Sequence, residues 1–323
     1  MEGKYLDFRR EASKFITEDR IYTDELRRFA WGTDAGFYRL VPQIVVRVKD
    51  EDEISRLLEL AGKYNVPLTF RAAGTSLSGQ SISDSVLIVA GKNWEGYSIS
   101  TDGTEITLQP GVIGSKVNDY LRPYRRKFGP DPASINSCMV GGIVMNNASG
   151  MSCGIYANSD RMLLNARIVF ADGSILDTSD PQSRNDFCHT HKTMLDAIVS
   201  LRDEVRADNV LAERIRRKYS IKNVTGLNLL PFLLYDDPFE IILHLLVGSE
   251  GTLAFVSQVT MATLPLEPLQ ANAMIYFKDM TEAARAVIAM KNLKVSAAEL
   301  LDKRSLASVN AGEVEGLTAV LTQ

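Results

Sequence analysis

The stretch Arg71-Ala-Ala-Gly-Thr-Ser-Leu-Ser-Gly-Gln-Ser81 decides the fold, and it directly follows a predicted strand. It contains two glycines and four hydroxyl side chains but no acidic residue. Glycine adopts positive φ easily and lets a ligand approach the backbone. Successive free N–H groups in such a loop form an anion-binding nest. The loop therefore predicts a diphosphate site, with an ordinary surface turn rich in Ser and Gly as the alternative.

Two familiar phosphate motifs do not fit this loop. The chain has no Gly-Lys-Ser/Thr, which excludes a P-loop NTPase by motif. The spacing is not G-x-G-x-x-G and no helix is predicted to follow, which disfavours a Rossmann dinucleotide fold. The nest is therefore expected to act without a helix dipole behind it.

The residues around the loop predict a small parallel unit. Residues 43–48 are β-branched and indicate a strand. Asp50 followed by Glu53 is a capping box, and the apolar spacing that follows predicts a helix. Strands are then expected at residues 68–71 and 86–90. This β-α-β pattern is typical of parallel strands.

Antiparallel structure is expected next. Asp102-Gly103 and Asp172-Gly173 predict two hairpins with type I′ turns. Residues 252–263 indicate a further strand or pair of strands. Residues 192–219 are expected to be helical, with the charged stretch 213–218 as a solvated face.

A further unit is predicted after Pro265, with a strand over 273–277 and a helix over 281–293 that Asp279 and Glu282 would cap. The chain ends in what looks like another strand, so we expect a third unit that the sequence cuts off. The overall fold class predicted is α+β.

Two more glycine-rich segments carry polar side chains. The first runs through 129–134 and 141–150 to Cys153-Gly154, and the second is Gly248-Ser-Glu-Gly-Thr252. The Gly141-Gly142 pair lets a flat group pass close to the backbone, and neutral amides suit the polar edge of a heterocycle. The alternative for the first segment is a glycine-rich loop that packs tightly for structural reasons. The alternative for the second is an ordinary turn that precedes a strand.

In this order the three segments resemble the flavin-binding domain of the vanillyl-alcohol oxidase and p-cresol methylhydroxylase (PCMH) superfamily, most of all its bacterial D-lactate and D-2-hydroxyglutarate dehydrogenase-like branch. The resemblance covers about residues 35–265. It implies a two-subdomain PCMH-type FAD-binding fold followed by the beginning of an α/β cap domain. The boundaries expected are a helical lead-in at 1–38, subdomain 1 at 39–97, subdomain 2 at 98–265 and an incomplete cap at 266–323.

The resemblance also implies which residues bind FAD. The FAD pyrophosphate would be wrapped by the loop residues, which are Arg71, Ala72, Ala73, Gly74, Thr75, Ser76, Leu77, Ser78, Gly79, Gln80 and Ser81. The ribityl and isoalloxazine part would be lined by Pro130, Asp131, Ser134, Gly141, Gly142, Asn146, Asn147, Gly150 and Gly154. The adenine or ribose end would lie near Glu250 and Gly251. Two departures from the family are Ser149 and Ala254, where glycine is common; Ala254 would narrow the backbone approach.

The implied activity is oxidation of a D-2-hydroxy acid, such as D-lactate or D-2-hydroxyglutarate, to the 2-oxo acid by hydride transfer to flavin N5. The base and metal ligands would lie beyond Gln323, so no catalytic residue or metal ligand is assigned, and iron–sulfur clusters are expected only in a missing C-terminal part. The electron acceptor (quinone, cytochrome or iron–sulfur module) stays open. Alternatives are a non-catalytic FAD-binding module and an NADPH-dependent flavin reductase.

Histidines and cysteines could change this interpretation. The nest contains no histidine, so non-covalent FAD is expected, with Cys153 a minor candidate for a covalent link. His189 and His191 could ligate a metal but have no third ligand nearby, and a surface or capping role is favoured. His244 lies in an apolar run and is predicted to be a core histidine.

Composition sets the remaining bounds. The 323 residues are 45% apolar and 24% charged, which excludes a disordered chain. With 36 basic and 40 acidic residues the net charge is −4, so no overall basic footprint for nucleic acid is present. No apolar run reaches about 18 residues, and three cysteines without C-x-x-C predict no disulfide framework. The expected location is the cytoplasm, with peripheral binding to the inner membrane left open and oligomeric state unknown.

Overall fold

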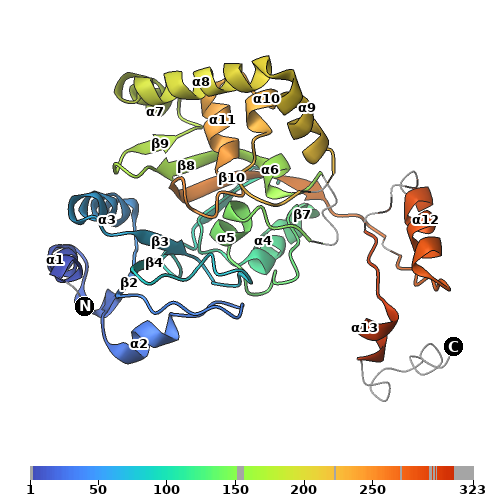
Figure 1. Cartoon of the computed structure of the whole chain (residues 1–323), viewed down its shortest axis with the longest axis horizontal. Helices are drawn as coiled ribbons and strands as arrows, with labels where there is room; N and C mark the ends of the chain where they lie inside the picture. The colour runs from blue at the N-terminus through green and yellow to red at the C-terminus, as the bar shows by residue number, and fades with distance from the viewer. Residues whose placement is uncertain are drawn as a thin grey trace. The chain divides into compact units, whose positions relative to one another are not determined.

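Two β-sheets with different strand orders carry the first structural unit, Met1–Gln270; the second unit is Ala271–Gln323 (Figure 1). The structure is a computed structural model that describes residues 3–150, 156–221, 223–269, 271–290, 293, 295 and 297–308. Parallel and antiparallel pairing both occur, so the predicted α+β class is confirmed.

The first sheet has the strand order β1-β2-β4-β3. Its strands are β1 (Ile21–Tyr22), β2 (Ile44–Arg47), β3 (Leu68–Arg71) and β4 (Val86–Val89). β2 and β3 both run parallel to β4, as predicted, and β1 pairs antiparallel with β2. All four residues of β4 are buried, as expected for a central strand of a parallel sheet.

Helix α3 (Glu51–Tyr64) connects β2 to β3, and its predicted N-cap is confirmed. The Asp50 carboxylate accepts from the Glu53 N–H at 3.0 Å. The capping box is not reciprocal, however, because the Glu53 carboxylate accepts from the Lys49 N–H and from the Arg20 guanidinium instead. The helix ends at Asn65, whose φ of 51° is left-handed.

The N-terminal segment packs on this sheet. It contains α1 (Gly3–Ala12), the 3-10 turn Glu18–Arg20 and α2 (Glu25–Ala30), and it also supplies strand β1, which the sequence did not indicate. Phe8 and Ile16 are buried in the same core as Ile54 and Leu57 of α3. The lead-in therefore stabilises the parallel sheet.

The second sheet is antiparallel, in the order β5-β6-β10-β8-β9, and β7 also pairs with β10. Its strands are β5 (Tyr97–Ile99), β6 (Glu105–Leu108), β7 (Arg126–Phe128), β8 (Leu163–Val169), β9 (Ile175–Asp177) and β10 (Phe255–Pro265). Strand β10 therefore ties the C-terminal end of this unit to both hairpins and to β7.

Both predicted hairpins form, but their turns are not type I′. Gly103 and Gly173 have φ of 72° and 83°, whereas Asp102 and Asp172 are not among the described residues with positive φ. Each aspartate instead accepts from the N–H two residues later, at Thr104 and Ser174. The short carboxylate thus stabilises a turn that needs only one left-handed residue.

Helices surround the antiparallel sheet. They are α4 (Gly114–Leu121), a 3-10 turn (Arg122–Tyr124), α5 (Val140–Met145), α6 (Ser159–Met162), α7 (Pro181–Thr190), α8 (Lys192–Ala207), α9 (Asn209–Lys218), α10 (Pro231–Leu234) and α11 (Pro238–Leu245). Figure 1 shows α7, α8 and α11 on one side of β8 and β10, with α4 and α5 on the other. The helix predicted over 192–219 is two helices, because Asp208 caps α9 through the Val210 and Leu211 N–H groups.

The second unit contains α12 (Met280–Met290) and α13 (Lys303–Ala307). The predicted Asp279 cap is confirmed, since its carboxylate accepts from the Thr281 and Glu282 N–H groups. The strand predicted over 273–277 is wrong: these exposed residues form no strand. The strand expected at the C-terminal end lies outside the described residues.

Glu51 at the start of α3 joins the two sheets. Its carboxylate accepts from Arg167 Nε of β8 at 2.7 Å and from the Ser257 hydroxyl of β10. Ser55, one turn further along α3, donates to the Gly173 carbonyl of the β8–β9 hairpin at 2.5 Å. These contacts fix the parallel sheet against the antiparallel one, so loops from both can form one site.

The buried ion pair between Arg20 and Glu53 gives the first prediction. The side chains are 13% and 3% exposed, and the guanidinium forms two hydrogen bonds at 2.7 and 2.6 Å. Arg20→Ala should lower the free energy of unfolding by about 3–5 kcal/mol, because it removes both guanidinium hydrogen bonds from a buried carboxylate and leaves only Lys49 Nζ, 3.8 Å away, as a cationic partner. Urea denaturation measures this loss.

Arg9→Ala is the matched control. Arg9 pairs with Glu18 at 3.2 Å, but both side chains are well exposed. Its removal should cost less than about 1 kcal/mol. Equal effects of the two substitutions would contradict the structural role given to Arg20.

Candidate functional site

The loop that follows β3 has a run of unused main-chain donors. The N–H groups of residues 72–78 donate to no acceptor among the described residues. No helix follows the loop, as predicted, so these amides are not the first turn of one. A run of unpaired N–H groups is the donor set that a phosphate anion requires.

Gly74 and Gly79 hold this loop in its turn. Their φ angles are 73° and 82°, a region that side chains resist. A Cβ at Gly74 would lie 2.2 Å from Arg71 Nη2, so the guanidinium packs directly against this glycine. Arg71 Nη1 in turn donates to the Thr33 carbonyl at 2.7 Å and to the Ser81 carbonyl at 3.3 Å. Arg71 therefore connects both ends of the loop to an earlier segment.

Two buried polar atoms of this loop lack a partner. Among the described residues, the buried side-chain polar atoms without a hydrogen bond are Arg71 Nε and Ser81 Oγ, at the two ends of the loop, and Asp160 Oδ1 elsewhere in the unit. Burial lowers the pKa of the Arg71 guanidinium, and the Asp34 carboxylate opposes that shift. Arginine stays charged at ordinary pH, so the loop combines a cation with free amides. Buried polar atoms left unpaired are costly, which indicates a ligand that completes the site.

The second glycine segment lies against this loop. A Cβ at Gly142 would lie 3.9 Å from Ala72 Cβ, which places the start of α5 beside the nest. At Gly141 a Cβ would lie 2.7 Å from Pro110 Cβ, and at Gly150 it would overlap the Asp131 carbonyl oxygen. Gly141 and Gly150 are therefore required for close packing, in agreement with the structural alternative given above, whereas Gly142 has room for a side-chain methyl group.

The third segment meets the other two at Glu250, whose φ is 56°. The Glu250 N–H donates to the Met145 carbonyl at 2.9 Å. The Glu250 carboxylate accepts from Asn146 Nδ2 at 2.6 Å and from Gln80 Nε2 at 3.4 Å. Burial raises the pKa of Glu250, while the two amide donors oppose that shift. The carboxylate thus joins all three predicted segments.

Asn147 lies at the far end of α5 with a φ of 52° and is 3% exposed. Its Oδ1 accepts from the Asp160 N–H at 3.3 Å. Behind it is a small cavity lined in part by Asp160, Arg161 and His244. His244 is buried and stacks on Tyr235, as a core histidine should, and burial lowers its pKa to about 4. The hydrogen bond from the Asp160 N–H therefore fixes the Asn147 side chain.

Some of the described residues predicted to bind FAD form no hydrogen bond with the nest, Asn146 or Glu250. The Ser134 carbonyl accepts from the Ser137 and Cys138 N–H groups and so belongs to a local turn. Pro130 is buried beside Gly129. Gly251 lies on the β3 side, where a Cβ would be 3.8 Å from Phe70 Cβ. Gly154 and Cys153 lie outside the described residues.

One acidic residue at the nest had not been anticipated. Asp34 Oδ2 accepts from the Gly79 N–H at 3.0 Å, although it lies 45 residues earlier in the chain. No motif around Asp34 signalled this contact, because it depends on how the N-terminal segment folds back over the loop.

Other candidate residues have structural roles. His191 Nε2 lies 2.9 Å from Asp172 Oδ2 and its Nδ1 lies 2.8 Å from Thr190 Oγ1, so it supports the β8–β9 hairpin. In the described part of the chain, no group of three or more His, Cys, Asp or Glu side chains could hold a metal ion. None of the described helices is long and apolar enough to cross a bilayer.

Comparison with known proteins indicates what the site is similar to. Residues 42–179 match the FAD binding domain family. The match includes the nest and the α5 segment but ends before Glu250.

The chain is also similar in sequence to proteins named as hydroxy-acid dehydrogenases. It is 26% identical over 306 residues to D-2-hydroxyglutarate dehydrogenase of Haemophilus influenzae, covering 90% of this chain and 29% of the relative. It is 23% identical over 316 residues to mitochondrial D-lactate dehydrogenase [cytochrome] of Arabidopsis thaliana, covering 96% and 46%. The chain therefore spans under half the length of these relatives.

The fold is of the PCMH type, as predicted. The solved structure of p-cresol methylhydroxylase with substrate bound superposes with a TM-score of 0.62 at 12% identity, covering 92% of this chain and 50% of that one. At this identity the likeness supports the fold alone. The donor set at residues 72–78 and the orphaned Arg71 Nε fit the diphosphate of FAD.

The nest glycines give the second prediction. Gly74→Val and Gly79→Val should each abolish FAD retention, because a branched side chain resists positive φ and, at Gly74, displaces the Arg71 guanidinium. Flavin content per chain after purification measures the effect. Gly62→Ala is the control, since a Cβ there meets nothing within 4 Å. Normal flavin content in both valine variants would refute the role of the nest.

The raised pKa of Glu250 gives the third prediction. An acid whose pKa is higher in the folded state stabilises the fold at low pH and loses this contribution as pH rises through that pKa. Glu250→Gln keeps an acceptor for Asn146 and Gln80 but carries no charge. The variant should therefore melt on the order of 1–2 °C higher than wild type at neutral pH.

The difference in melting temperature should vanish toward pH 4. Glu213→Gln, on the exposed face of α9, should shift the melting temperature by less at either pH. A Glu250→Gln variant that is less stable at neutral pH and equal at low pH would reverse the sign and contradict the burial argument.

Proposed function

We propose that this chain binds FAD non-covalently and forms the flavin-holding part of a dehydrogenase for a D-2-hydroxy acid of the D-lactate or D-2-hydroxyglutarate class. The observation that carries the proposal is the run of seven unpaired N–H groups at residues 72–78, beside the Arg71 cation. The relatives named for these two substrates support the substrate class.

Each segment has a proposed task. The nest holds the diphosphate through main-chain N–H groups, as free amides bind anions elsewhere. Gly141, Gly142 and Asn147, with Pro130 and Asp131, line the ring system. At Gly142 the absent side chain leaves the backbone accessible, since a Cβ there would meet only Ala72 Cβ at 3.9 Å. Glu250 and Gly251 lie toward the adenine or ribose, and the carboxylate can accept from hydroxyl groups there.

When bound, FAD supplies a hydride acceptor at N5, and the chemistry of the redox step is that of the cofactor. The contribution of this chain is to bind and orient it. Glu250 accepts hydrogen bonds from Gln80 and Asn146, so residues proposed to bind different parts of FAD are positioned by one network. Binding of the hydroxy acid and removal of its proton are assigned to a cap portion and not to residues of the first unit.

Non-covalent binding is part of the proposal. No histidine lies within residues 71–81, which leaves Cys153, outside the described residues, as the minor candidate for a covalent link. We therefore expect acid precipitation to release all of the flavin into the supernatant.

The fourth prediction tests the cofactor. The purified chain should be yellow and carry about one FAD per chain, and Arg216→Ala on the exposed face of α9 should not change that content. A colourless protein that does not bind added FAD would contradict the proposal that this chain binds FAD.

The substrate class has its own test, made under anaerobic conditions on protein that includes a cap portion. Bleaching of the flavin by D-lactate or D-2-hydroxyglutarate, with the L-enantiomers inactive, is the expected result. Bleaching by NADPH alone would favour a flavin reductase. A flavin that no hydroxy acid reduces would leave a non-catalytic FAD-binding module.

A further inference from the structure

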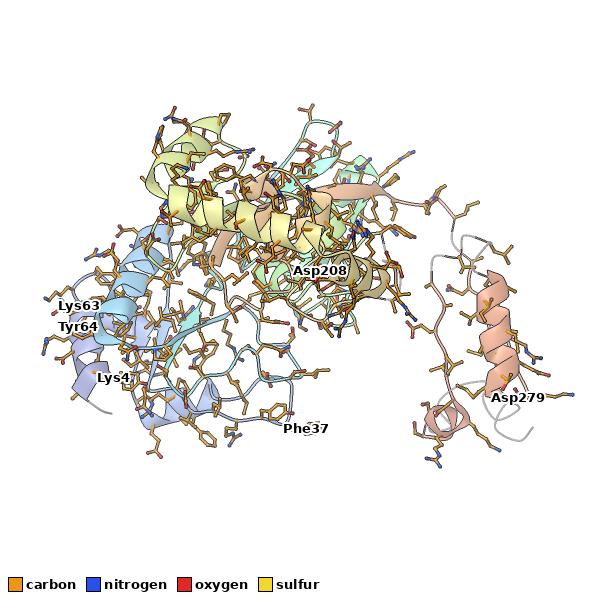
Figure 2. All side chains as sticks on the ribbon, turned by 45° about the horizontal axis from the view of Figure 1, so that its top comes forward. Lys4, Phe37, Lys63, Tyr64, Asp208 and Asp279 are labelled. Atoms are coloured by element: carbon orange, nitrogen blue, oxygen red, sulfur yellow. The ribbon has the colours of Figure 1, made fainter. Side chains whose placement is uncertain are left out.

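A short hairpin before the matched FAD-binding domain packs on the nest. Thr33 and Arg39 form an antiparallel bridge, so residues 33–39 fold back on themselves. Phe37 at the tip is fully exposed, and Figure 2 shows it at the margin of the N-terminal part of the structure. The Tyr38 ring lies against Gly79, 3.5 Å from where a Cβ would stand. The hairpin lies outside residues 42–179, so its role does not follow from the family match.

The hairpin holds the loop mainly through the Asp34 carboxylate. Oδ1 accepts from the Gly36 N–H at 2.7 Å and Oδ2 accepts from the Gly79 N–H at 3.0 Å. One side chain therefore links the hairpin's own turn to the end of the nest. Because Gly79 donates to Asp34, the amides left unpaired are those of residues 72–78.

Two further contacts fix the hairpin to the loop. The Ala35 N–H donates to the Ser76 carbonyl at 3.0 Å. Arg71 donates to the Thr33 carbonyl at 2.7 Å and to the Ser81 carbonyl at 3.3 Å. The Ser76 carbonyl and the Gly79 N–H both form hydrogen bonds with the hairpin. The orientation of the peptide groups between Arg71 and Ser81 therefore depends on residues 33–36.

We propose that Asp34 is a positioning residue for FAD, whose carboxylate orders the nest before the diphosphate arrives. The inference rests on the proposed function, because it requires that the nest bind FAD. Ordering a loop in advance raises affinity, since the conformational entropy is lost on folding and not on binding. The opposite role is a competitor: a carboxylate so close to the nest would repel the diphosphate, and its removal would tighten binding.

The fifth prediction separates these roles. Asp34→Ala should weaken FAD binding by about tenfold or more, measured by titration of the apoprotein with quenching of flavin fluorescence. In the apoprotein, the Gly36 and Gly79 amides should exchange hydrogen faster than in wild type. The melting temperature of the apoprotein should change little, because the contacts lie at a surface loop. Asp34→Asn, which keeps the shape but accepts fewer hydrogen bonds, should have an intermediate affinity and carries the test if the alanine variant does not fold.

Asp24→Ala is the matched control. Asp24 lies in the same N-terminal segment and caps α2 by accepting from the Arg27 N–H at 3.0 Å, but no contact joins it to the nest in the described residues. It should leave FAD affinity within twofold of wild type.

Each outcome has a distinct meaning. Wild-type protein that binds FAD, with Asp34→Ala and Asp34→Asn binding equally well or more tightly, would overturn the positioning role and leave the proposed function intact. Unchanged exchange at Gly36 and Gly79 in Asp34→Ala would overturn it as well. Wild-type protein that binds no FAD would remove the proposed function together with this inference.

Discussion

The candidate site depends on a run of main-chain N–H groups that have no hydrogen-bond acceptor within the described chain. Between the end of β3 and Gly79, seven successive N–H groups are unpaired within the described chain, and Arg71 Nε is buried without a partner beside them. Most buried backbone groups in proteins are paired, so such a run requires an anion or solvent to satisfy it. The positive φ of Gly74 and Gly79, the packing of Arg71 and the contact with Asp34 all serve to keep these amides turned outward.

The loop and the other two segments can form one site only because the parallel and antiparallel sheets are fixed against each other. Glu51 at the first turn of α3 connects β8 and β10 of the antiparallel sheet to the parallel one. Glu250, which follows α11, then reaches both Gln80 of the nest and Asn146 of α5. A half-buried carboxylate with two amide donors is a specific junction, because few other pairings would leave all three groups satisfied. The candidate site is therefore assembled from segments that lie about 170 residues apart in sequence.

Local signals in the sequence predicted local structure well. The β-branched strands, the Asp50 cap and the Asp279 cap are all present, because each depends on neighbours within a few residues. The nest was predicted from its composition for the same reason. Contacts between distant residues could not be predicted: nothing near Asp34 or Glu250 reports which amide each one meets. The two errors have different origins, one distant and one local. Residues 273–277 have strand-like side chains but no sheet to join in the described chain, and the Asp-Gly turns were misassigned because aspartate bonds its own backbone.

Hydrogen exchange across residues 72–78, compared with and without saturating FAD, tests the central claim most directly. If this loop binds the diphosphate, its amides should exchange rapidly in the apoprotein and gain protection when FAD is bound, while exchange at the amides of the exposed helix α9 should not change. Amides that are already protected without the cofactor, or that show no gain although FAD is bound, would contradict the assignment of this loop as the diphosphate site.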